Sequence, residues 1–118
     1  MVIIEIVNDN VILEVQGWDK VWTLKSHMKI PLMNIVNVYT DPTTTLGWWK
    51  GFRAPGTHIP GVIVAGTFYR DGKRIFWDVK NPENTIIVEL EDERYNQLII
   101  EVENPSKTVN QIKEAKAI

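Results

Sequence analysis

Alternation of apolar and polar residues with a period of two runs through most of the chain and restricts its possible folds more than any other feature. A strand with one buried and one solvated face has this period, whereas a helix repeats every 3.6 residues. Turn-forming residues separate most of the alternating runs. The predicted strand regions are residues 2–16, 22–30, 35–40, 61–69, 75–79, 85–90 and 97–102.

Two short polar segments predict hairpins. Asn8-Asp9-Asn10 divides residues 2–16 into two strands, and Arg70-Asp71-Gly72-Lys73 joins two later strands. An Asp-Gly pair can adopt the positive φ angles of a type I′ turn, whose twist matches that of the strands it joins. Pro31 is expected to end its strand, since proline offers no N–H to the ladder.

The last segment has helical features. Asn104 is a suitable N-cap, and Pro105 suits the first helical position, where an N–H would have no partner within the helix. We predict a helix over about residues 105–116. Its apolar residues recur at a spacing of three and form a narrow stripe that must pack on another element: Val109, Ile112 and Ala115.

Together these patterns predict a mainly β fold with one C-terminal α-helix. About seven strands, ending near residue 103, are expected to form a small barrel or sandwich that the helix closes. The 118 residues allow one domain, taken as residues 1–118. Alternation also places Trp77 and Asp78 on opposite faces of one strand, so one is expected in the core and the other at the rim.

Charge and composition limit the classes of function. The chain has 13 basic and 15 acidic residues, a formal net charge of −2, which offers no global field for nucleic acid. It has no cysteine, which excludes a thiolate zinc site and a cysteine nucleophile and fits a reducing compartment. Without a signal-peptide pattern or a long apolar run, a cytoplasmic protein is expected.

Several motifs in the sequence resemble those of a bacterial pleckstrin-homology-like domain family of uncharacterised function. The resemblance covers roughly residues 18 to 113 and implies a strand-rich fold with a closing helix, but little about activity. The motifs that carry it are Trp48-Trp49-Lys50-Gly51-Phe52-Arg53-Ala54-Pro55-Gly56-Thr57-His58-Ile59-Pro60-Gly61, Ala65-Gly66-Thr67-Phe68, Gly72-Lys73-Arg74-Ile75-Phe76-Trp77-Asp78, Leu90-Glu91-Asp92-Glu93-Arg94-Tyr95-Asn96-Gln97-Leu98 and Asn104-Pro105.

The chain departs from pleckstrin-homology domains that bind phosphoinositides. Those domains carry several Lys and Arg residues in the loop between their first two strands. The corresponding candidates here, residues 7–10 and 16–20, offer Lys20 against Asp9 and Asp19. Phosphate recognition needs a convergent cluster of donors, so these loops give no support to lipid-headgroup binding.

The loop from Trp48 to Gly61 is the main candidate for a recognition site. Aromatic residues beside arginine are typical of interface anchors, and long loops in compact domains are often functional. We therefore expect a binding or scaffolding module whose ligand is a protein or peptide. The alternative is that the aromatic residues plug the mouth of the barrel. The candidate binding residues are Trp48, Trp49, Lys50, Phe52, Arg53 and His58.

The same sequence leaves two further functions open. Lys50, Arg53 and the tryptophans of this loop would allow weak contact with a membrane, as a peripheral adapter. An enzyme would need Arg53, His58 and Asp78 to converge. No metal-binding spacing, phosphate loop or nucleophile arrangement is present, so no enzyme, metal or cofactor is expected.

Self-association is also a hypothesis. Residues 20–29 carry lysines and no acid, whereas residues 89–103 are mostly acidic among their charged positions. The two regions of different copies would be complementary in charge. Unpaired strand edges offer a second route to a homo-oligomer, since they present unsatisfied N–H and C=O groups.

Overall fold

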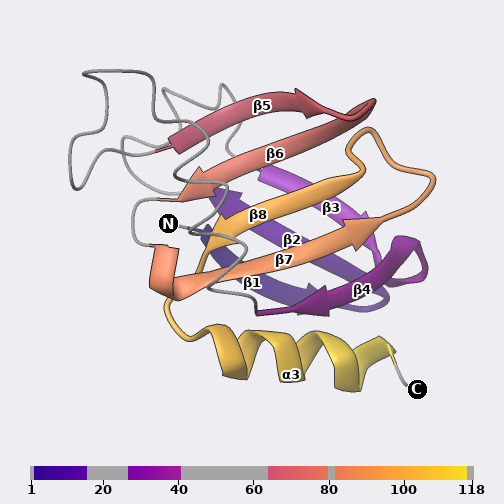
Figure 1. The fold of residues 1–118 in the computed structure, drawn as a ribbon. Coiled ribbons are helices and arrows are strands. Elements are labelled where there is room, and N and C mark those ends of the chain that lie inside the picture. Colours follow the sequence, from indigo (N-terminus) through magenta and orange to yellow (C-terminus); the bar gives the residue numbers. More distant parts are fainter. Residues whose placement is uncertain (1, 16–26, 41–63, 80–81, 117–118) are drawn as a thin grey trace.

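Two β-sheets and one α-helix make up the part of the chain that the structure describes. The computed structural model describes residues 2–15, 27–40, 64–79 and 82–116, which form eight strands, two short 3-10 helices and the helix α3. Figure 1 shows the smaller sheet behind the larger one, with α3 along the lower side of both.

The smaller sheet has three antiparallel strands in the order β1-β2-β3: β1 (Val2–Val7), β2 (Asn10–Val15) and β3 (His27–Pro31). The predicted first hairpin is confirmed: Val7 pairs with Asn10 across a two-residue turn, in which Asn8 has a φ of 56°. Asparagine tolerates this left-handed conformation better than most residues. Pro31 ends β3, as predicted.

The larger sheet has five strands in the order β4-β7-β8-β6-β5. β6 and β8 are parallel neighbours, and the other pairs are antiparallel. The 3-10 helix η1 (Leu32–Asn34) leads into β4, and η2 (Pro82–Asn84) leads into β7. The strands are β4 (Ile35–Tyr39), β5 (Val64–Arg70), β6 (Lys73–Val79), β7 (Thr85–Leu90) and β8 (Gln97–Glu101).

The expected mainly β fold is confirmed, and the barrel or sandwich of about seven strands is observed as two sheets with eight strands in the described residues, not as a closed barrel. The sheets separate because β4 does not continue the ladder of β3. After Pro31 and η1 the chain enters the larger sheet, where β4 pairs with β7. Within the described residues, no strand pairing joins one sheet to the other.

The β5–β6 hairpin has the predicted turn. Asp71 and Gly72 have φ angles of 52° and 78°, and Arg70 pairs with Lys73 on either side of them. Two positive φ values are the requirement of a type I′ turn. The Asp-Gly pair therefore fixes this register, as the sequence indicates.

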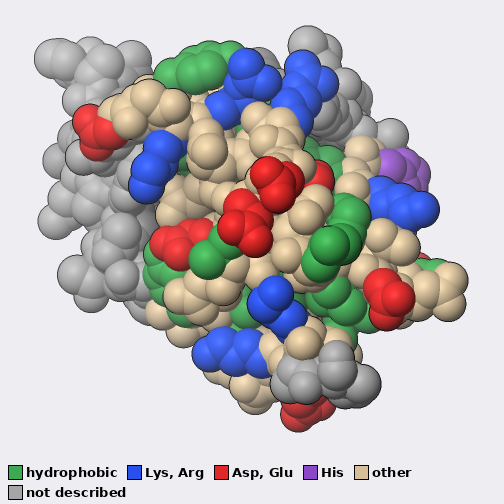
Figure 2. All heavy atoms as spheres, turned by 90° about the vertical axis from the view of Figure 1, so that its right-hand side faces the viewer, with side chains coloured by type: hydrophobic (Ala, Val, Ile, Leu, Met, Phe, Trp, Pro, Cys, Tyr) green, Lys and Arg blue, Asp and Glu red, His purple; other side chains and the backbone are tan. Residues whose placement is uncertain are grey.

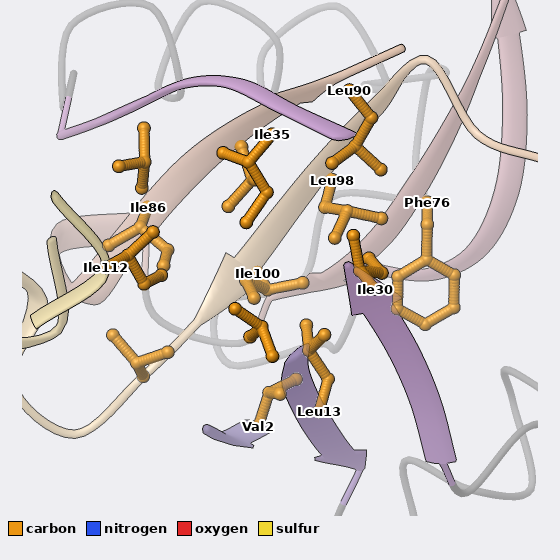
Figure 3. Packing of buried hydrophobic residues seen from close by; sticks show 14 of the residues in the cluster. Val2, Leu13, Ile30, Ile35, Phe76, Ile86, Leu90, Leu98, Ile100 and Ile112 are labelled. Atoms are coloured by element: carbon orange, nitrogen blue, oxygen red, sulfur yellow. The ribbon is translucent and has the colours of Figure 1, made fainter. Parts of the chain in front are cut away.

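The main core lies between the inner faces of the two sheets (Figure 3). The smaller sheet contributes Val2, Leu13 and Ile30, and the larger sheet contributes residues such as Ile86 and Ile100. Each of these is less than a tenth exposed, so alternation identifies the inward positions correctly. Burial of such side chains is the dominant favourable term in folding.

The larger sheet is buried on its second face as well, which overturns one expectation. Ile75, Trp77 and Val79 of β6 form a separate buried cluster with Ile87 and Ile99. Trp77 and Asp78 do point to opposite faces, but both are 0% exposed. The prediction of one core and one rim residue is wrong because both faces of β6 are buried: Trp77 belongs to the second cluster, and Asp78 shares the face of Phe76, which lies in the main core.

The C-terminal helix α3 (Pro105–Lys116) begins and packs as predicted. The side-chain oxygen of Asn104 accepts a hydrogen bond of 3.2 Å from the N–H of Lys107, which is N-capping geometry. Val109 and Ile112 are buried in the main core. Among the described residues, no helix has the length and apolar character needed to cross a bilayer.

We predict that Ile112→Ala lowers the free energy of unfolding by about 2–5 kcal/mol, because Ile112 is 1% exposed and its removal leaves a cavity under α3. The matched control is the neighbouring exposed Gln111→Ala, for which a change within about 0.5 kcal/mol is expected. Urea denaturation of both variants measures the difference. Equal stability of the two variants would contradict the packing of the helix described here.

Candidate functional site

The candidate residues of the Trp48–Gly61 loop lie outside the described residues. The structure therefore does not test whether this loop is a recognition surface or a plug, and it places none of the predicted binding residues. These are Trp48, Trp49, Lys50, Phe52, Arg53 and His58.

Asp78 is the one member of the postulated acid–base set that is described. It lies on β6 between Trp77 and Val79, on the same face as Phe76, and is completely buried. Arg53 and His58 lie outside the described residues, so the set remains a prediction. Elsewhere in the described residues, no three His, Cys, Asp or Glu side chains gather closely enough to hold a metal ion.

A groove lies between β1 and α3. Its first part has a volume of about 610 Å³ and extends along β1 from Val2 to Ile4. Its helical wall includes Lys107, Thr108 and Gln111. Figure 1 shows α3 running below β1, which places the strand and the helix on the two sides of this space.

A second hollow of about 420 Å³ continues the groove. It lies beside Ile4, Glu5 and Ile6 and is bounded on the helix by Gln111 and Ala115. Ile4 and Gln111 line both parts, so the hollows are neighbours along one strand and one helix. The β1–α3 groove, as we call the two parts together, is elongated rather than closed.

One hydrogen bond shows which backbone groups of β1 face this groove. The N–H of Leu32 donates to the carbonyl of Asp9 at 2.8 Å, so the odd-numbered residues along β2 bond toward β3. Bonding directions alternate along an antiparallel strand, so the even-numbered residues of β2 bond toward β1. Their partners on β1 are Ile3, Glu5 and Val7.

The remaining residues of β1 therefore direct their N–H and C=O groups away from β2. These residues are Val2, Ile4 and Ile6. In the part of the chain that the structure describes, β2 is the only strand paired with β1, whose second edge has no neighbouring strand. A row of backbone donors and acceptors thus borders the groove, and such a row is a template for an added strand.

The side chains of β1 are apolar on both faces. Ile4 and Ile6 are partly buried and pack against the main core. On the outer face, Ile3 is 46% and Val7 is 43% exposed, with Glu5 between them. Apolar residues on both faces of β1 are the signal that the sequence offers for this site. The sequence does not show that β1 is an edge strand, so it does not predict the groove.

The charges that line the groove are mainly acidic. Glu5, Glu103 and Glu114 line it together with one base, Lys107. On the face seen in Figure 2, acidic side chains lie near the centre, and Lys and Arg side chains lie above and below them. In the described part of the chain, the groove thus combines an edge of β1 that has no paired strand with a mainly acidic border.

Comparisons with family models, with curated proteins and with solved structures find no match for this chain.

We predict that proline is tolerated on β1 where the N–H faces the groove. The free energy of unfolding of Ile6→Pro is expected to lie within about 1 kcal/mol of that of Ile6→Val, a variant of similar volume that keeps the N–H. Glu5→Pro removes a hydrogen bond of the ladder between β1 and β2. It is expected to lower the free energy of unfolding by about 1–3 kcal/mol more than Glu5→Val does. Denaturant unfolding measures all four. An equally large loss at Ile6 would show that its N–H is already bonded.

Proposed function

We propose that this protein is a non-enzymatic binding module that recognises an extended segment of a partner protein in the β1–α3 groove. The observation that carries the proposal is the edge of β1 that has no paired strand within the described residues, beside an open groove of about 610 Å³. An extended peptide that adds to a sheet edge gains main-chain hydrogen bonds from the edge and side-chain contacts from its surroundings.

The length of the groove suits such a ligand. It extends along β1 from Val2 to Ile6. At about 3.4 Å per residue, this distance is about 14 Å, which corresponds to roughly five residues of an added strand. The main-chain groups of Val2, Ile4 and Ile6 would pair with the added strand, while α3 would form the other wall.

Two other sheet edges carry features that oppose strand addition, and β1 lacks them. β3 ends in Pro31 and has the exposed lysine Lys29. β4 is interrupted by a register shift between Ile35 and Asn37. Proline, lysine and bulges all protect edges. β1 has six residues in uninterrupted register, and its only charged residue is Glu5.

Membership of the pleckstrin-homology-like family is part of the same proposal. Its support is the resemblance of the motifs and the order of the elements, in which a series of strands precedes one helix that packs on the core. The Trp48–Gly61 loop remains the sequence-based candidate for a second contact with the partner.

We predict that selection from a random twelve-residue peptide library yields binders of β1. On addition of a selected peptide, the amide NMR signals of Ile4 and Ile6 are expected to shift and their hydrogen exchange to slow, because their N–H groups acquire acceptors. Ile6→Pro should weaken binding and Ile6→Val should not. Failure to enrich any peptide, or shifts that leave β1 and α3 unchanged, would refute the proposal.

The loop prediction has a separate test with the same peptides. If Trp48 and Trp49 belong to the recognition surface, Trp48→Ala/Trp49→Ala is expected to weaken binding at least about tenfold while the unfolding midpoint changes little. If they plug the fold, the double variant loses stability instead, by about 3 kcal/mol or more. Fluorescence anisotropy and urea denaturation of the one variant distinguish the two outcomes.

A further inference from the structure

We infer that the segment bound in the β1–α3 groove carries a basic residue at its centre and an apolar residue two positions to either side. The inference rests on the proposed function and specifies the chemistry of the partner. It follows from the side chains that an added strand would meet on the outer face of the smaller sheet.

The outer face of β1 presents an apolar-acidic-apolar row. Ile3 and Val7 are each more than two-fifths exposed, and Glu5 lies between them. In an added strand, side chains on this face would stand directly beside these three, at cross-strand distances of about 5 Å. Apolar residues therefore fit beside Ile3 and Val7, and lysine or arginine fits beside Glu5.

Glu5 has its charge available for such a partner. Within the described residues it makes no ion pair, and its neighbour across the ladder is the apolar Ile12. Lys29 follows on β3, two strands away. That separation is about 10 Å, close to the screening length at 0.1 M salt.

The helical side of the groove also favours a positively charged ligand. Glu103 and Glu114 line it, against Lys107. A basic segment is thus attracted by the border of the groove as well as by Glu5, and a segment with an acidic centre is repelled. Complementary charge of this kind contributes more to specificity than to total affinity.

The direction of the added strand does not change the pattern. Ile3 and Val7 are placed symmetrically about Glu5, so a segment with an apolar-x-basic-x-apolar sequence meets the same row when read in either direction. The side chains at the two x positions would lie on the other face, beside Ile4 and Ile6.

Three synthetic twelve-residue peptides test the inference. They share two valines and alternating threonines, and they differ only at the central position between the valines, which is Lys, Gln or Glu. Fluorescence anisotropy at low salt is expected to give the order Lys, then Gln, then Glu, with about two- to fivefold between steps. Rising salt should reduce the differences.

Variants of the protein assign the preference to one side chain. Glu5→Gln is expected to remove most of the difference between the peptides, and Glu5→Lys to reverse their order. Glu14→Gln is the matched control, because Glu14 lies on the same face of β2, one strand further from the groove, and it should leave the order unchanged. A preference that survives Glu5→Lys would overturn the inference.

The possible failures are distinguishable. The three peptides could shift the amide NMR signals of Ile4 and Ile6 and bind with equal affinity, or the library could yield β1 binders without a basic central residue. In either case the inferred preference for a basic residue is wrong while the proposed function stands. If no peptide reaches β1, both fail. If the amides of Ile4 and Ile6 are protected only in a concentration-dependent dimer, a second copy occupies the groove and the inferred partner is wrong.

Discussion

Packing of α3 against the shared core is the contact on which the rest of the structure depends. Val109 and Ile112 enter the main core, so one narrow stripe of the helix is fixed between the sheets. The stripe is narrow because apolar residues recur only every third position, and the neighbouring Gln111 stays exposed. The helix therefore lies beside β1 without covering its edge, and the groove is the space that remains between them.

Features set by neighbouring residues could be predicted from the sequence. Asn8 and Asp71-Gly72 specify two-residue turns, and Asn104 specifies the start of α3, because each acts through backbone angles or hydrogen bonds within a few positions. Alternation also identified the inward residues of the hairpins, since a strand with one buried face has a period of two. The presence of these strands and the start of the helix could therefore be predicted without knowledge of distant contacts.

Features set by distant pairing could not be predicted in this way. The order β4-β7-β8-β6-β5 places β6 parallel to β8, and nothing in the alternation of β6 indicates that both of its neighbours are strands of the same sheet. Alternation along β6 likewise does not indicate that both faces of the larger sheet are packed, and for this reason the prediction that one of Trp77 and Asp78 lies at the rim failed. The groove was missed because β1 has the same pattern whether it lies at an edge or in the middle of a sheet. Only the sheet order shows that β1 is an edge strand, and only the packing of α3 shows that the helix lies beside it.

Glu5 connects the stability of the monomer with recognition. An edge of six regular residues with no partner strand, as the described residues show for β1, invites pairing with another copy, and charge is one means by which proteins oppose this. In a symmetric antiparallel pair centred on Glu5, two carboxylates would face each other across the new ladder. In a pair centred on Ile4, each Glu5 would face Ile3 of the other copy and gain no partner. A basic segment removes both disadvantages, so the residue that opposes self-pairing also favours a ligand of opposite charge.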